Sequence, residues 1–165
     1  MKRDENAVIV EKCLREKGLE FQKVTDKDDD IVFWGDMTGL DGHEKVRVIV
    51  MVNGDRIASY TSFPSAEKSS IEETAKSLSG VNMSLPFGFF VVDWNDGKIF
   101  FRLTYSACVL QTDDARECVT RLVNLPYAMY YKHSKAITAV RLGLATAEEA
   151  VRLEEAGKGN ANTQS

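Results

Sequence analysis

The stretch PFGFFVVDWNDGKIFFRL (Pro86–Leu103) consists of two apolar runs on either side of the short polar segment WNDGK. Runs rich in aromatic and β-branched residues are typical of strands, and Asp-Gly between them is typical of a hairpin turn. Such a turn keeps its aspartate in water, whereas a catalytic carboxylate pair needs one desolvated member. We therefore interpret WNDGK as a turn and do not assign Asp93 and Asp96 to acid–base chemistry.

The turn also predicts which side chains of the hairpin lie together. If Asp96-Gly97 is a two-residue turn, Trp94 lies opposite Ile99, and alternate residues share a face. One face is then wholly apolar, and we assign it to the core: Phe90, Val92, Trp94, Ile99, Phe101 and Leu103. The other face holds Phe87, Phe89, Val91, Asp93, Phe100, Arg102 and Thr104. A three-residue turn would exchange these assignments.

A second hairpin is predicted at Asn53-Gly54, between VRVIVMV and RIASYTSF, because both residues tolerate the positive φ that a two-residue turn requires. The same counting places on the core face Val46, Val48, Val50, Val52 and Ile57. The reverse face carries Arg47, Ile49, Met51, Arg56, Ala58 and Tyr60. Both hairpins thus predict one buried face and one face that mixes arginines with apolar side chains.

Helical spacing of apolar residues precedes and follows these strands. A helix over residues 4–17 should end at Gly18 in a left-handed C-cap. Ser70 and Glu73 form a capping-box pattern for a second helix, which Gly80 closes.

Towards the C-terminus a long helix should be kinked or restarted at Pro126. Thr146 and Glu149 form another capping box, for a short helix that ends near Gly157. The order is helix, four strands, helix, two strands and helices, which predicts an α+β fold with an antiparallel β-sheet of about five to six strands. We expect helices packed on one face of the sheet, in a single domain over residues 1–156, and a disordered C-terminal tail over residues 157–165.

The composition is that of a soluble protein of one domain, with 165 residues, 44% hydrophobic and 28% charged. A net charge of −4 argues against a nucleic-acid or membrane surface spread over the whole molecule. AVIV near the start is too short for a signal peptide, and no run approaches the ~20 apolar residues of a membrane span. Cys13, Cys108 and Cys118 lack CxxC spacing, so we expect reduced core residues of a cytoplasmic protein.

No metal or cofactor site is predicted. Counted as a calcium loop from Asp93, the glycine arrives one place early, and counted from Asp26, isoleucine takes its place. His43 and His133 have no Asp or Cys partner nearby in the sequence, so we expect both to be structural or solvent-exposed.

The segment YAMYYKHSK could resemble a nucleic-acid patch. At helical spacing, however, we expect Tyr127 and Tyr131 to pack inward while Lys132 and Lys135 stay in water. Phosphate-binding loops, H-E-x-x-H and G-x-S-x-G are also absent from the sequence. No residue is therefore assigned a catalytic role, and we expect a protein that is not an enzyme and that binds neither nucleic acid nor membrane.

The mixed face of the sheet is the candidate protein-binding site. Its predicted residues are Ile49, Met51, Tyr60, Phe89, Val91, Phe100 and Arg102. Aromatic residues, methionine and arginine are enriched at interface centres, and Arg102 and Tyr60 are the candidate anchors. Two interpretations remain open: this face binds a partner, or a terminal helix covers it within the monomer.

The order of elements and the segment VNMSLPFGFFVVDWNDGKIFFRLTYS, followed by a long helix, resemble the YbjN family of bacterial proteins, which are labelled sensory transduction regulators. Asn82, Phe87–Trp94, Gly97–Tyr105 and Thr112–Gly143 stand in the places of the family's turn, hairpin and last helix. The resemblance implies a fold like that of the type III secretion chaperones, which bind partner polypeptides, often as dimers. It supplies no catalytic residues, and the helix at Thr146 extends past the family's usual end.

Two functions follow as hypotheses. The first is a non-enzymatic protein-binding or regulatory module that self-associates, as a homodimer, or binds a client polypeptide. The alternative is a small-molecule sensor or enzyme that uses a cleft between the sheet and the last helix.

Overall fold

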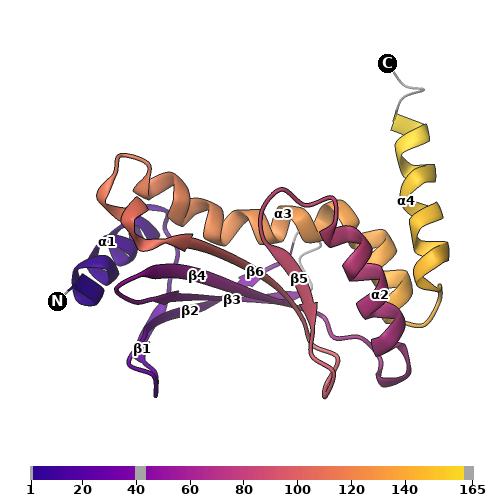
Figure 1. Cartoon of the computed structure of the whole chain (residues 1–165), viewed down its shortest axis with the longest axis horizontal. Coiled ribbons are helices and arrows are strands. Elements are labelled where there is room, and N and C mark those ends of the chain that lie inside the picture. The colour runs from indigo at the N-terminus through magenta and orange to yellow at the C-terminus, as the bar shows by residue number, and fades with distance from the viewer. Residues whose placement is uncertain (1, 40–43, 162–165) are drawn as a thin grey trace. The chain divides into compact units, whose positions relative to one another are not determined.

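The computed structural model describes residues 2–39 and 44–161 of the chain (Figure 1). The elements are, in order, α1 (Lys2–Glu16), β1 (Gln22–Thr25), β2 (Ile31–Thr38), β3 (Lys45–Val52), β4 (Arg56–Phe63), η1 (Lys68–Ser70), α2 (Ile71–Asn82), β5 (Phe89–Val92), β6 (Ile99–Ser106), η2 (Ala107–Gln111), α3 (Ala115–Arg141) and α4 (Ala147–Ala161). The six strands form one open antiparallel sheet in the order β1-β2-β3-β4-β6-β5. The α+β class and the order of elements are therefore as predicted.

The chain divides into two compact units. Unit 1 comprises Met1–Phe63 and Phe101–Tyr127, and unit 2 comprises Pro64–Phe100 and Ala128–Ser165. Strand β6 and helix α3 each run from one unit into the other. A single domain over residues 1–156 stays a prediction.

The core of unit 1 lies on the predicted face of β3 and β4. No more than 1% of each of these side chains is exposed: Val46, Val48, Val50, Val52 and Ile57. Complete burial of one such side chain stabilises the fold by about 1.5–3 kcal/mol relative to exposure. Helix α1 packs on this side of the sheet. Its Glu11 accepts a hydrogen bond from Lys23. The Lys23 ammonium in turn lies 5.6 Å from the ring centroid of Phe33, which is buried in the core.

The turn between β3 and β4 lies one residue later than predicted. The Asn53 N–H donates to the Arg56 carbonyl at 3.1 Å, which leaves Gly54 and Asp55 at its centre. The Asn53 Oδ1 accepts from the N–H groups of Asp55 and Arg56, both at 2.9 Å. Neither Asn53 nor Gly54 has a positive φ, so that expectation is wrong. Asn53 closes the turn with its side chain.

The turn between β5 and β6 is longer than predicted. The Asp93 N–H donates to the Lys98 carbonyl, and the Gly97 N–H donates to the Asp93 carbonyl, each at 2.8 Å. The loop between the paired residues therefore contains four residues, Trp94–Gly97. Gly97 has the predicted positive φ, at +73°. Trp94 lies in this loop and is 64% exposed, so its assignment to the core face is wrong.

In both hairpins the observed register differs from the predicted one by two residues. Met51 lies opposite Ala58 instead of Arg56, and Lys98 lies opposite Asp93 instead of Asn95. Side chains alternate along a strand with a period of two, so an even shift leaves each one on its predicted face. The rest of the predicted core face of the second hairpin is buried: Phe90, Val92, Ile99, Phe101 and Leu103.

Helix α2 packs against β5 and closes its outer edge. The helix continues past Gly80, where we expected its end, to Asn82. The Asn82 Nδ2 donates to the Phe90 carbonyl at 2.9 Å, and its Oδ1 accepts from the Phe90 N–H at 2.7 Å. Because β5 is an edge strand, this amide occupies backbone groups that an added strand would use.

The two predicted capping boxes have different outcomes. Thr146 and Glu149 bond reciprocally, with the Thr146 N–H on the Glu149 Oε2 at 2.8 Å and the Glu149 N–H on the Thr146 Oγ1 at 3.2 Å. The box at Ser70 is wrong, because its side chain makes no capping hydrogen bond. Glu73 instead accepts from the Ala147 N–H at 2.8 Å, so it links α2 to the start of α4.

Three other helix boundaries were predicted. Gly18, the second residue after α1, has a φ of +70°, which confirms the C-cap. Helix α3 is continuous through Pro126, so a restart there is wrong. Helix α4 reaches Ala161 and therefore ends later than the predicted Gly157, while the last four residues of the expected disordered tail lie outside the described residues.

Gly97→Val should reduce the free energy of unfolding by at least about 2 kcal/mol, because it combines a strained φ with steric overlap. A Cβ at this position would overlap the Ala66 carbonyl oxygen. The matched control is Gly54→Val, where a Cβ meets no atom within 4 Å and the change should stay within about 0.5–1 kcal/mol. Urea unfolding of both variants measures the difference, and equal losses would contradict the described loop.

Asn82→Ala should cost about 1–3 kcal/mol, because it leaves the N–H and carbonyl of Phe90 without their partner. Asn95→Ala is the control, since Asn95 is exposed in the hairpin loop and should change stability by less than about 0.5 kcal/mol. Hydrogen exchange at the Phe90 amide, followed by NMR, should accelerate only in the first variant. An unchanged exchange rate would show that the amide does not protect this edge.

Candidate functional site

The face of unit 1 opposite its core consists of cross-strand rows. One row contains Gln22, Trp34, Ile49 and Tyr60, and the next contains Val24, Val32, Met51 and Ala58. Helix α1 lies on the core side and does not cover these rows (Figure 1). We name the following residues the open face: Gln22, Val24, Val32, Trp34, Asp36, Lys45, Arg47, Ile49, Met51, Arg56, Tyr60 and Arg102.

Two arginines of the open face lie over aromatic rings. The Arg47 guanidinium is 4.8 Å from the Trp34 ring centroid, and that of Arg102 is 5.4 Å from the Tyr60 centroid. Each such contact stabilises by roughly 0.5–1 kcal/mol at an exposed site. It also holds a flat cationic group against the apolar rows, which is an arrangement suited to binding.

Asp36 fixes the position of Arg47. Its two carboxylate oxygens accept from the guanidinium Nε at 2.7 Å and Nη2 at 3.0 Å, which is the bidentate geometry of a strong charge-assisted pair. The hydrogen bonds from Arg47 lower the pKa of Asp36, and those to Asp36 raise the pKa of Arg47. Both groups are therefore ionised at neutral pH.

The open face is basic, although the chain is acidic. It carries four cationic side chains, Lys45, Arg47, Arg56 and Arg102, and one carboxylate, Asp36. Three net positive charges thus lie on a face of a protein whose net charge is −4. Such a segregation favours anionic partners at this face.

The structure brings together four of the seven predicted site residues. Ile49, Met51 and Tyr60 are half-buried on the open face, and Arg102 stacks on Tyr60. The other three belong to unit 2, on the outward face of the β5–β6 hairpin. There Phe89 is 43% exposed and Val91 is 42% exposed, while Lys98 lies 5.9 Å from the centroid of the half-buried Phe100.

The sequence prediction missed three apolar residues of the open face: Val24, Val32 and Trp34. Strict alternation in IVFWGDM separates the buried Ile31 and Phe33 from Val32 and Trp34, so a signal was present. The connection between β1 and β2 contains no tight Gly-containing turn, so the sequence offers nothing that sets the register of these strands.

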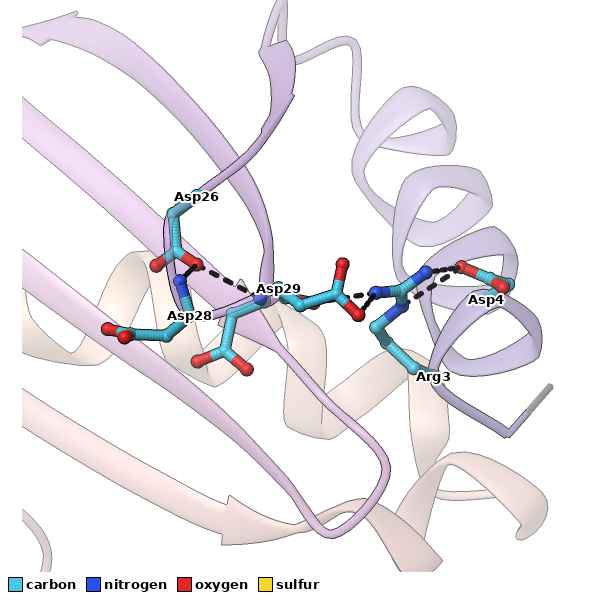
Figure 2. Close-up of polar contacts among 6 residues, drawn as sticks. Arg3, Asp4, Asp26, Asp28 and Asp29 are labelled. Carbon is cyan, nitrogen blue, oxygen red and sulfur yellow. Dashed lines mark hydrogen bonds and ion pairs between the residues drawn. The ribbon is translucent and has the colours of Figure 1, made fainter.

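The acidic loop Asp26–Asp30 is stabilised by its own polar contacts (Figure 2). The Asp26 Oδ1 accepts from the N–H groups of Asp28 at 2.9 Å and Asp30 at 3.0 Å. Asp29, with a φ of 64°, forms an ion pair with Arg3, which also donates to its carbonyl at 2.7 Å. In the described part of the chain no group of three or more His, Cys, Asp or Glu side chains is placed to hold a metal ion.

The carboxylates of WNDGK serve the turn itself. The Asp93 Oδ1 accepts from the Asn95 N–H at 2.8 Å, and the Asp96 Oδ1 accepts from the Lys98 N–H at 2.9 Å. These are local Asx contacts that stabilise a turn. The interpretation of this segment as a turn is confirmed.

His133 has a carboxylate partner that the sequence did not reveal. Only 7% of the residue is exposed, and its Nδ1 lies 2.6 Å from the Glu154 Oε1. The pair joins α3 to α4 across 21 positions of sequence, so local reading could not find it. His43 lies outside the described residues.

The tyrosine-rich segment packs differently from our prediction. Tyr130 is the buried ring, at 3% exposure, and its edge-to-face contact with Tyr131 has a centroid distance of 5.9 Å. Tyr127 and Tyr131 are only half-buried, so their assignment to the interior is wrong. Lys132 and Lys135 are exposed as predicted.

The three cysteines are free thiols. Cys13 is buried in α1 and Cys118 is half-buried in α3, and burial raises the pKa of both thiols. Cys108 is exposed in η2, so its assignment to the core is wrong.

No helix within the described ranges combines the length and the apolar character that crossing a membrane requires. Comparison of the chain with models of protein families, with curated proteins and with solved structures finds no match. The geometry of the open face is therefore the basis for assigning a function.

Arg47→Gln should raise the pKa of Asp36 towards its ordinary value, because it removes the two hydrogen bonds that favour the carboxylate. The pKa of Asp36 is lowered by folding, so the contribution of this pair to stability is present at neutral pH. It is lost as the pH falls through the lowered pKa. Carboxylate carbon shifts followed by NMR between about pH 2 and 6 measure the change.

Lys45→Gln is the control for that titration. Lys45 acts on Asp36 only through a weaker Coulombic interaction, so the pKa of Asp36 should stay low. Equal pKa values in both variants would show that the bidentate pair is not formed in solution.

Proposed function

We propose that this protein is a non-enzymatic module that binds a partner polypeptide through the open face. The observation that carries the proposal is the set of apolar cross-strand rows centred on Ile49 and Met51, flanked by arginines stacked on Trp34 and Tyr60. Methionine, aromatic side chains and arginine are the residues that interface centres favour.

The dimensions of this face indicate what it binds. Five strands lie about 4.8 Å apart, with a length of roughly 13 Å for β1 and roughly 20–26 Å for each of the others, and present a planar area of roughly 400–500 Å². A stable complex between globular proteins buries about 800 Å² on each partner. The face therefore suits one segment of a partner chain, bound reversibly, better than a broad globular surface.

Charge complementarity selects an acidic segment. The open face carries three net positive charges, so a segment with carboxylates beside apolar residues satisfies both the arginines and the rows. A second copy of this chain is the other possible occupant, since its net charge of −4 also permits attraction. The two occupants are distinguished below by the mass of a covalent adduct.

The resemblance to the YbjN family and to the type III secretion chaperones supports the same function. It rests on the order of a helix, four strands, a helix, two strands and further helices, which the chain has. Such a likeness implies binding of polypeptides in the cytoplasm without catalysis. We include that location in the proposal.

Site-specific photo-crosslinking in the cells of origin tests the proposed function. A benzoylphenylalanine residue in place of Met51 lies on the open face, whereas one in place of Val8, which is 63% exposed on α1, is the control. We expect an adduct only from position 51, joined to an acidic and apolar segment that mass spectrometry identifies. A synthetic peptide of that segment should then bind the purified protein.

Charge reversal tests whether the arginines of the open face contribute to binding of that peptide. Arg47→Glu with Arg102→Glu should weaken binding of that peptide at least tenfold, or about 1.4 kcal/mol, while the circular dichroism spectrum stays unchanged. An adduct of twice the monomer mass would identify a second copy as the occupant and overturn the choice of an acidic client. Equal adducts from positions 51 and 8, or none, would overturn the function itself.

A further inference from the structure

Helix α4 and the part of α3 that belongs to unit 2 line an open-sided cavity of about 350 Å³. Its lining residues are Lys132, His133, Lys135, Ala136, Leu153, Glu154, Gly157 and Lys158. Its volume is within the range of small-molecule sites, which begins at about 300 Å³. The apolar part of the lining comes from Ala136, Leu153 and the methylene stems of the lysines.

The charges around this cavity are unbalanced. Lys132, Lys135 and Lys158 are all exposed, and none forms an ion pair with a described residue, whereas Glu154 is the single carboxylate of the lining. A comparable cavity of about 270 Å³ beside α1 differs, because there Glu11 pairs with both Arg15 and Lys23. Among the described lining residues, the cavity between α3 and α4 thus has three lysines and one carboxylate, which is an excess of positive charge.

His133 provides a second, independent observation. Its Nδ1 is paired with Glu154, whereas its Nε2 has no hydrogen-bond partner among the described residues. Buried polar atoms in folded proteins nearly always have a partner, so one without any calls for an explanation. A ligand that enters the cavity would supply the missing group.

We propose that this cavity binds a small organic anion with a short apolar body. The carboxylate or phosphate group lies among Lys132, Lys135 and Lys158, within reach of the imidazole of His133. The apolar body packs against Ala136 and Leu153. This site belongs to unit 2 and does not depend on the binding of a polypeptide at the open face.

Gly157 makes the proposal testable without damage to the fold. A Cβ built on this residue meets no atom within 4 Å, although the residue lines the cavity in the middle of α4. Gly157→Leu therefore adds a large apolar side chain to the lining, which should obstruct the cavity, and also favours the helix, since leucine is a better helix former than glycine. Gly54→Leu is the control, because a Cβ at Gly54 likewise meets no atom within 4 Å, and Gly54 belongs to unit 1 and does not line this cavity.

Titration of the full chain with sodium octanoate, followed by amide NMR shifts, tests the site. We expect saturable shifts in residues 132–136 and 153–158, and at least tenfold weaker binding in Gly157→Leu but not in Gly54→Leu. Replacing the three cavity lysines by glutamine should also weaken binding at least tenfold. Lys17→Gln with Lys27→Gln, two exposed lysines of unit 1, should leave it unchanged.

Two further probes identify the chemistry of the ligand. Octyl phosphate should bind as well as octanoate if charge and apolar body are both used, and neutral octanol should bind at least tenfold more weakly. Octanol that binds equally would overturn the assignment to an anion. Absence of saturable shifts with both anions, or full binding in Gly157→Leu, would overturn the site.

Discussion

Burial of one face of the sheet is the constraint on which the other features of unit 1 depend. Side chains alternate along each strand, so a shift of one residue would bring Arg47, Ile49 and Met51 into the core and send the β3 valines to the surface. A shift of two residues gives each side chain a different partner on the neighbouring strand but leaves it on the same face of the sheet. Both hairpins differ from their predicted register by this tolerated amount. The hairpin loops can thus change the register by two residues without moving any core side chain to the surface.

Polar side chains that reach across the chain hold the ends of the elements. Asn53 closes its own turn, and its carbonyl accepts from the Nδ2 of the fully buried Asn6 at 2.9 Å, which ties α1 to the β3–β4 hairpin. Glu73 leaves its expected capping role because the Ala147 N–H offers a tertiary partner. The amide of Asn6 and the carboxylate of Glu73 thus each bind a backbone group far away in the sequence.

Periodicity was sufficient to predict the order of elements and the two faces of the hairpins, because these follow from short-range alternation and from burial. Trp94 was misplaced because the sequence does not show how many residues the turn contains. The pairing of His133 with Glu154, and hence the cavity between α3 and α4, depends on how two helices dock. The rows through Val24, Val32 and Trp34 depend on the register between β1 and β2, which no tight turn in the sequence predicts. The features that the sequence did not predict therefore depend on contacts between elements that are distant in the sequence.

The amide of Asn82 has a consequence for the behaviour of the protein in a crowded cell. Strand β5, with the sequence FFVV, combines high apolar content with a position at the edge of the sheet, which is the type of segment that templates aggregation. With its Phe90 backbone groups already occupied, this strand offers an incoming chain a broken hydrogen-bond ladder. Aggregation from this edge then requires prior local opening of α2, so its rate is set by that opening and not by collisions between folded molecules.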